Sequence, residues 1–317
     1  MTQGQPIIPN RGGCFWLIQL ATSSSLPVCA GTIPPRTRRS TTLGTIIATS
    51  CILDNLLHIP HHRNDPKAKI TDREILTIAI LACQEFAGNM SKALQWSKAR
   101  QLFAFVPAES RFTRRRHRRM PLLHALAPPL RAVGEALQTC TADALDTFPM
   151  PVCENIRANR CRIAPEKAFR GYRAAHRDDF HGVKVHLWVA SGGFVVAFWL
   201  TLGSWHDLTG LYGMALDIPC GCALMMHRGY TDYVAADLLR EAEGLEVYPV
   251  RRRTSVRYAG CRQDLAVVKR CFVERVGLCL RSLLPRRVHA VTLDGFVLKL
   301  MCFIHAHNFN LLHKVAS

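Results

Sequence analysis

The spacing of apolar residues divides the chain into a helical part and a part of mixed pattern. From residue 71, apolar positions recur every three or four residues, which places them on one face of a helix. They are Ile75, Ile78, Ala79, Ala82 and Phe86. Thr71 is followed three residues later by Glu74, the spacing of a capping box that begins a helix. We predict further helices at 43–59 and up to about residue 138, interrupted by prolines at positions 107, 121, 128 and 129.

After residue 138, short apolar runs alternate with helical segments. The runs are bounded by turn residues and are rich in aromatic and β-branched side chains, which is typical of buried strands. We predict strands at 139–146, 181–191, 194–204, 222–227 and 246–252. We predict helices at 206–218, 231–245 and 263–284. This order of elements predicts an α/β fold, a mixed (α+β) sheet flanked by helices.

One stretch, 187–205, has no charged residue and approaches the length of a membrane span. Its centre is Ser-Gly-Gly, and both flanks are rich in Val, Phe and Trp. These features favour two buried strands joined by a tight turn. We therefore expect no membrane association.

Three regions follow from these patterns. Residues 1–40 have no persistent period and contain many Pro, Gly, Ser and Thr residues, so we expect a disordered or non-native leader. Residues 41–137 form a basic α-helical region. Residues 138–317 contain the predicted sheet.

The net charge of the chain indicates a type of binding partner. The chain has 41 Lys and Arg residues against 23 Asp and Glu residues, a net charge of +18. The densest basic cluster lies at 110–120, a stretch without any acidic residue. Its arginines are Arg111, Arg114, Arg115, Arg116, Arg118 and Arg119. Such a run favours contact with the phosphates of a polyanion, although a basic surface without a partner is the alternative.

Cysteine usage indicates reduced thiols. The 13 cysteines are scattered between Cys14 and Cys302, and an odd number cannot pair completely. Cys220 and Cys222 form a single pair without a partner pair at a zinc-ligand spacing. We expect buried thiols in a cytosolic protein.

Four short blocks occur in the predicted sheet region. They are "LDTFPMPVC" at 145–153, "FHGVKVHLWV" at 180–189, "MHRGY" at 226–230 and "KRCFVERVGLCLR" at 269–281. They resemble the Asp-Ser-x-Pro, Gly-Tyr-Lys-x-His, Asp-Lys-Gly-Tyr and Arg-x3-Glu-x6-Lys blocks of DDE-type transposases of bacterial insertion sequences. The resemblance implies a ribonuclease-H-like βββαβαβα catalytic domain at 138–317, preceded by a DNA-binding helical region at 41–137.

The resemblance also implies metal-binding residues. Asp146 and Glu274 occupy the first and third ligand positions of the family, whose two Mg²⁺ (or Mn²⁺) ions hold the attacking and leaving oxygens of phosphoryl transfer. Arg270, Glu274 and Arg281 lie at i, i+4 and i+11, so they share one helix face that could meet metal and phosphate. The residues alone also allow a turn role for Asp146 and a surface ion pair for Glu274.

His227 stands where the family has its second catalytic Asp, two residues before Gly229. Imidazole suits Zn²⁺ or Mn²⁺ better than Mg²⁺, and the change removes one negative charge from the site. We expect a degenerate copy with impaired catalysis; a working atypical site and a core histidine are the alternatives. Lys184 shares a sheet face with His186 and either contacts phosphate or is solvated.

The resemblance implies a transposase that binds the terminal inverted repeats of its element, cleaves DNA with a metal ion and joins the ends to target DNA. We expect it to act as a homodimer on DNA in the bacterial cytoplasm, associated with the nucleoid. Two alternatives remain: a catalytically inert DNA-binding protein derived from a transposase, and a metal-dependent nuclease of the same fold.

Overall fold

The computed structural model describes residues 17–18, 43–58, 62–136, 142–173, 177–190, 192–212, 223–226, 228–249, 274, 276–285 and 288–315. The first part of the chain is helical, as predicted. Its helices are α1 (Leu43–His58), α2 (Asp72–Glu85), α3 (Met90–Ala99), α4 (Glu109–Arg118), α5 (Met120–Ala125) and α6 (Ala127–Ala136). The predicted capping box is present at the start of α2, where Thr71 accepts the Glu74 N–H and Glu74 accepts the Thr71 N–H.

The described strands form one mixed sheet. They are β1 (Leu17–Ile18), β2 (Ala142–Cys153), β3 (Arg170–Arg173), β4 (Asp178–Val189), β5 (Val195–Leu202), β6 (Ala223–Met226) and β7 (Glu246–Pro249). Their order is β1-β5-β4-β2-β6-β7, and β3 pairs with β4. The β2–β4 and β4–β5 pairs are antiparallel, whereas β2–β6 and β6–β7 are parallel. The predicted hairpin at 181–204 is thus confirmed.

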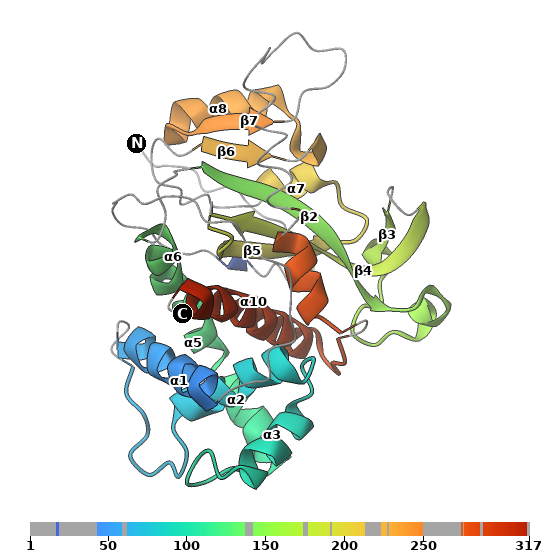
Figure 1. Cartoon of the computed structure of the whole chain (residues 1–317). Coiled ribbons are helices and arrows are strands. Elements are labelled where there is room, and N and C mark those ends of the chain that lie inside the picture. The colour runs from blue at the N-terminus through green and yellow to red at the C-terminus, as the bar shows by residue number, and fades with distance from the viewer. Residues whose placement is uncertain are drawn as a thin grey trace, which may run out of the picture.

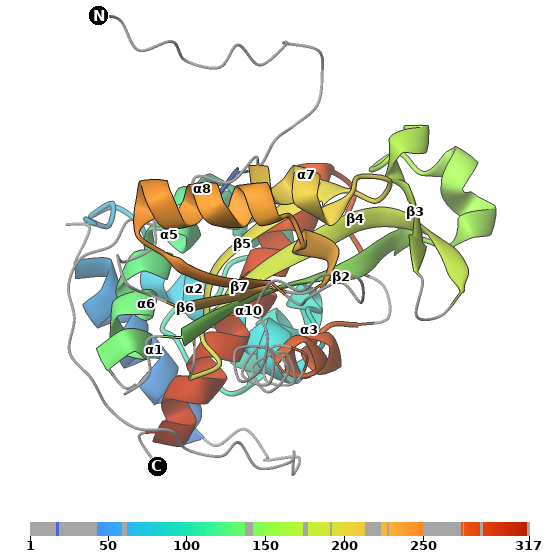
Figure 2. The same cartoon turned by 90° about the horizontal axis from the view of Figure 1, so that it is seen from above.

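Helices cover both faces of this sheet (Figure 2). On one face lie α7 (Asp207–Tyr212) and α8 (Tyr233–Glu243), and on the other lies the helix that includes residues 276–283. The succession β2, β4, β5, α7, β6, α8, β7 and this last helix is the βββαβαβα order predicted from the sequence. The fold class is therefore confirmed as a mixed α/β domain of the ribonuclease-H-like kind.

A long helix that the sequence analysis does not predict, α10 (Leu293–Val315), lies between the sheet and the first helices (Figure 1). It packs against α1, α2, α5 and β5. The Asn308 side chain bonds both the N–H and the C=O of Val195 at 2.9 Å, and His307 bonds the Gly193 carbonyl at 3.0 Å. The helical part and the sheet consequently share one apolar core. No described helix is long and apolar enough to span a membrane.

Two strands differ from the prediction. Leu17 and Ile18, in the segment expected to be a disordered leader, form β1 and pair with β5. Strand β2 continues to Cys153 instead of ending at residue 146, although it contains Pro149 and Pro151. In the described residues β2 pairs with β6 only as far as Leu145, so each proline lies where the missing N–H can face an open strand edge.

Candidate active site

Asp146 lies where β2 separates from β6. Leu145 is the register partner of Met226, the last residue of β6, and Asp146 is the next residue along β2. On its other side Asp146 pairs with Leu187 of β4. Its carboxylate is half-buried, and Oδ1 accepts the Thr147 N–H at 2.7 Å. Asp146 is therefore a residue of a central strand and not of a turn, at the parallel edge where β6 ends.

Arg281 reaches this part of the sheet from the helix that includes residues 276–283. Its guanidinium carbon lies 5.1 Å from the ring centroid of Phe148, two residues after Asp146 on the same strand face. Desolvation lowers the pKa of Arg281, the Asp146 carboxylate opposes this shift, and Arg173 adds to it. The structure thus brings together Asp146 and Arg281, two of the residues predicted from the sequence.

Glu274 lies on the same helix as Arg281 and is exposed to solvent. The two residues are seven positions apart, so they fall on one helix face about 10 Å apart along the axis. The helix face that carries Arg281 beside Asp146 thus also carries the Glu274 carboxylate. Two other predicted residues, His227 and Arg270, lie outside the described part of the chain.

Lys184 points to the opposite face of the sheet from Arg281. Its Nζ lies 3.0 Å from Asp207 Oδ1 and donates to the Trp205 carbonyl at 2.6 Å. Both side chains of the ion pair are largely buried. The predicted alternatives for Lys184 were phosphate contact and solvation; the structure instead places it in an ion pair with Asp207.

Asp207 also lies beside the turn that follows β6, which the sequence did not reveal. A Cβ atom on Gly229 would come within 2.4 Å of Asp207 Oδ2, so no larger residue fits at position 229 without movement of Asp207. The close approach of Asp207 therefore explains why glycine occupies position 229. A second acidic group thus lies close to the turn Arg228–Tyr230.

A buried polar network fixes the same turn. Tyr230, in the 3₁₀ turn Arg228–Tyr230, is fully buried, and its hydroxyl bonds both the Thr147 hydroxyl and His186 Nδ1. His186 Nε2 shares a further hydrogen bond with Thr201 at 2.8 Å, and its ring stacks on Trp199 with centroids 5.0 Å apart. These bonds hold the turn against β2, one residue from Asp146.

Burial keeps this network neutral. Desolvation lowers the pKa of His186 to about 3; the charge of Asp207 acts against this shift and that of Lys184 adds to it. Desolvation also raises the pKa of Tyr230, partly offset by its bond with Thr147, and the charges of Asp207 and Asp146 raise it further. His186 and Tyr230 are therefore positioning residues that carry no charge near neutral pH.

The predicted DNA-binding arginines of 110–120 divide into two sets. Arg115 and Arg119 each lie within 2.9 Å of a carboxylate oxygen of Asp72 on α2, and Arg116 is only 3% exposed. The exposed set consists of Arg111, Arg114 and Arg118. Arg115 and Arg119 thus join α4 and its C-terminal cap to α2, and Arg116 is buried. Of these six arginines, only the exposed set can reach a phosphate without rearrangement of the helices.

The described donors suit a hard divalent cation. Asp146 and Glu274 each offer carboxylate oxygens, which Mg²⁺ and Mn²⁺ prefer. Asp146 Oδ1 already accepts a backbone N–H, that of Thr147, and the second predicted ligand position falls at His227, outside the described residues. Asp146 and Glu274, at the first and third predicted positions, thus offer the kind of donor that the predicted metal chemistry needs.

Part of the chain matches a known protein family. Residues 138–285 match a family model described as the transposase DDE domain. The match begins four residues before β2 and ends two residues after the helical segment 276–283, so it includes Asp146, His227 and Glu274. Domains of this family generally use divalent metal ions. No curated protein and no solved structure matches the chain significantly.

Proposed function

We propose that this chain, whose residues 138–285 form a DDE transposase domain, is the transposase of an insertion sequence. In this proposal it binds the terminal inverted repeats of its element, cleaves a phosphodiester and joins the freed 3′ end to target DNA. The observation that supports it best is the position of Asp146 in the matched domain, on a central strand where β6 ends and beside Arg281.

Each residue of the site has a stated part in the proposal. Asp146 and Glu274 would hold divalent cations, Mg²⁺ or Mn²⁺, and such ions would supply positive charge to the oxygens of the in-line displacement. Arg281, held over the Phe148 ring, is oriented to meet a phosphate close to Asp146. Tyr230 and His186 keep the turn after β6 against β2.

His227 is proposed to limit the reaction. An imidazole in place of a carboxylate lowers the negative charge of the metal site and replaces a hard oxygen donor by a borderline nitrogen donor. We infer weak binding of Mg²⁺ and slow cleavage. Because the protein is proposed to be a degenerate copy, the loss is expected in the chemical step and not in DNA binding.

DNA contact is proposed for the exposed arginines of α4, which are Arg111, Arg114 and Arg118, and for Arg270 and Arg281. The exposure of the first three supports this choice over Arg115, Arg116 and Arg119, whose guanidiniums have partners or are buried. Strand transfer at two ends favours a homodimer on DNA. Its site of action is proposed to be the bacterial nucleoid, in the cytoplasm.

The test compares His227→Asp with the wild type on a duplex that carries the terminal repeat found in the DNA flanking the reading frame. With Mg²⁺ we expect His227→Asp to nick at the repeat end at least ten-fold faster, and with Mn²⁺ we expect a smaller gain. The control is His227→Asp combined with Asp146→Asn, which should nick no faster than buffer.

Two results would contradict the proposal. In the first, His227→Asp binds the repeat with unchanged affinity but gains no nicking with either metal. In the second, nicking persists after Asp146→Asn, so that Asp146 holds no metal needed for cleavage.

The inert DNA-binding protein is the second candidate, and the histidine at position 227 favours it. It predicts salt-sensitive binding to the same ends that survives Asp146→Ala and Glu274→Ala, with no nicking even after His227→Asp. Joining of labelled ends to a target plasmid separates a transposase from a nuclease, because only a transposase makes joined products.

A further inference from the structure

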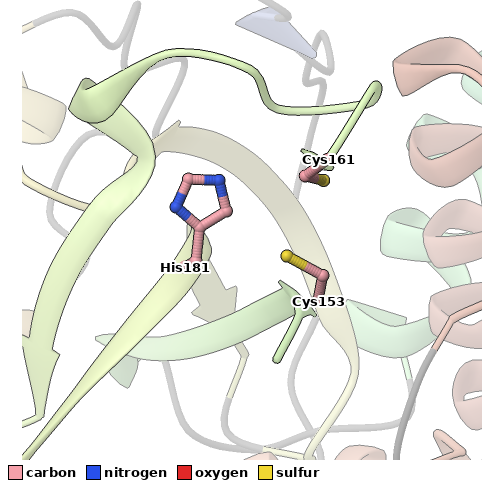
Figure 3. Close-up of side chains that lie close together, drawn as sticks. All are labelled: Cys153, Cys161 and His181. Atoms are coloured by element: carbon pink, nitrogen blue, oxygen red, sulfur yellow. The ribbon is translucent and has the colours of Figure 1, made fainter. Parts of the chain in front are cut away.

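Three potential metal ligands lie together at the end of the sheet away from β6. They are Cys153 at the end of β2, Cys161 in the following loop and His181 on β4 (Figure 3). Their ligand atoms, the two sulfurs and a ring nitrogen, all lie within 4.8 Å of one another. Both cysteines are free thiols, and His181 is buried.

The sheet register brings the first and third of these residues together. Cys153 is the register partner of His181 across the antiparallel β2–β4 pair, after an irregularity between Pro151 and Cys153. Gly182 allows the close approach of the two strands there, because a Cβ at that position would lie 2.1 Å from the Met150 carbonyl oxygen. Side chains of directly paired residues lie on the same sheet face, so those of Cys153 and His181 are neighbours.

A short 3₁₀ segment, Asn155–Arg160, returns the chain to this pair. The Cys161 N–H donates to the Ala158 carbonyl at 3.1 Å, and this bond closes the segment. Three residues later, the Ala164 carbonyl accepts a hydrogen bond from His181 Nε2–H at 2.7 Å. The loop 154–164 thus ends against the imidazole, with Cys161 beside it.

Few side chains of the loop are buried. None of the residues Asn155–Arg160 is buried, and Ile156 is 95% exposed. The Asn155 side chain donates to the Asp179 carbonyl at 2.7 Å, and Cys161 and Ile163 are only partly buried against the core. Segments that bury too little apolar surface to stabilise themselves commonly depend on a disulfide or a metal.

We propose that Cys153, Cys161 and His181 bind a zinc ion that fastens the loop 154–164 to the ends of β2 and β4. Two thiolates and one imidazole are the soft and borderline donors that select Zn²⁺ over Mg²⁺. With zinc–sulfur bonds of about 2.3 Å and zinc–nitrogen bonds of about 2.0 Å, tetrahedral ligand atoms lie about 3.5 to 3.8 Å apart.

The observed separations are therefore within about 1 Å of those of a formed site. A change of χ1 at Cys161, which is on the loop and half-buried, can supply that closure without movement of the strands. Three protein donors leave the fourth position to a water molecule. This site is separate from the carboxylate site at Asp146, whose oxygen donors suit a different metal.

A disulfide between Cys153 and Cys161 is the competing outcome. It would close the same loop but would leave the buried imidazole of His181 without a part in the linkage. The presence of a third donor, with all three ligand atoms within 4.8 Å of one another, favours the metal.

The test measures zinc in the full-length protein, purified under reducing conditions and passed over a chelating resin. Zinc per chain is compared for the wild type, Cys153→Ser, Cys161→Ser and His181→Asn, with Cys51→Ser and Cys279→Ser as controls for the remaining thiols. Each of the first three variants should lose one equivalent of zinc relative to the wild type, and both controls should retain it. Cobalt loading should give a thiolate-to-cobalt absorption band that disappears in the same three variants.

A second measurement remains informative if Cys153→Ser or His181→Asn does not fold. Arg157, Arg160 and Arg162 are exposed in the loop, so trypsin can cut there. Added Zn²⁺ should slow these cuts at least ten-fold in the wild type and in Cys51→Ser but not in Cys161→Ser, whose substitution lies in the loop outside the core.

Three results would overturn the proposal. The first is a wild type that binds no zinc at submicromolar concentration. The second is unchanged zinc content in Cys161→Ser. The third is a disulfide between Cys153 and Cys161 in protein purified without reductant, detected as a loss of two hydrogens from the mass of the peptides that contain them. In that case protection from trypsin would need no metal.

Discussion

Asp72 is the buried carboxylate that joins α2 to α4, and its replacement by Asn tests the division of the arginine cluster. Its side chain is 0% exposed and lies 2.8 Å from an Arg115 guanidinium nitrogen and 2.9 Å from Arg119 Nε. His62 Nε2 lies 3.0 Å from its other oxygen. Asp72→Asn keeps the size of the side chain but removes the charge that both guanidiniums face.

The expected loss of stability follows from the burial of the pair. Removal of one partner of a buried ion pair costs about 3 to 5 kcal/mol, because a charge is left without compensation. Arg115 and Arg119 retain 20% and 33% side-chain exposure, so solvent screens part of this cost. We therefore expect Asp72→Asn to lower the free energy of unfolding by about 3 kcal/mol.

The matched control is Asp54→Asn, which removes the partner of Arg73. That pair has a longer separation of 3.3 Å, and its side chains are 34% and 45% exposed. An exposed pair of this kind contributes about 0 to 1 kcal/mol. Urea unfolding followed by far-ultraviolet circular dichroism gives both values, from the midpoint at constant m-value.

The pH dependence gives an independent check. Burial alone would raise the pKa of Asp72, but hydrogen bonds from Arg115 and Arg119 outweigh it and lower the pKa below 3.8. A carboxyl group with a lowered pKa stabilises the fold above its unfolded pKa, and this stabilisation is lost as pH falls through the folded pKa. Below pH about 4 the wild type should lose this contribution, whereas Asp72→Asn should not. Equal losses in Asp72→Asn and Asp54→Asn at pH 7 would refute the assignment of Arg115 and Arg119 to a structural role.

Two further predictions concern the DNA-contact helix and the turn after β6. Arg114→Ala should weaken DNA binding without loss of stability and reduce the slope of log binding constant against log salt concentration by about one. Fluorescence anisotropy at several salt concentrations measures this slope. Arg116→Ala, at a buried residue, should instead lower the unfolding midpoint. Tyr230→Phe should cost about 1 to 3 kcal/mol, because Thr147 and His186 lose a buried hydrogen-bond partner, while Tyr172→Phe, at an exposed residue, should cost nothing measurable by urea unfolding.

The order of secondary structure could be predicted because, along most of the chain, the spacing of apolar residues matches the buried face of each helix or strand. Helix α2 has one apolar face and a capping box, and β4 and β5 are apolar runs joined by a glycine turn. Helix α10 was missed because it has no polar face to reveal its period: residues 296–309 are buried except for Lys299. Strand β2 was predicted too short, since Pro149 and Pro151 resemble a strand end unless the open edge beyond Leu145 is known.

The candidate site was only partly predictable for a related reason. A family motif places Asp146 and Glu274 along the chain, but it does not give the residues that reach them from elsewhere. Asp72 meets Arg115 across 43 positions, and no local pattern distinguishes Arg115 from the exposed Arg114. The triplet of Cys153, Cys161 and His181 has none of the paired spacings of familiar zinc motifs, because a strand register joins its first and last members.

Hydrogen bonds and close packing support the turn after β6 independently of a bound metal. The turn after β6 is held by the Tyr230 hydroxyl against Thr147 and His186, and by the fit of Gly229 beside Asp207. None of these contacts involves residue 227 or needs a bound metal. If position 227 holds a metal ligand, as proposed, an aspartate there would precede a turn whose contacts at Gly229 and Tyr230 are already in place, so His227→Asp is the substitution expected to raise activity in a single step.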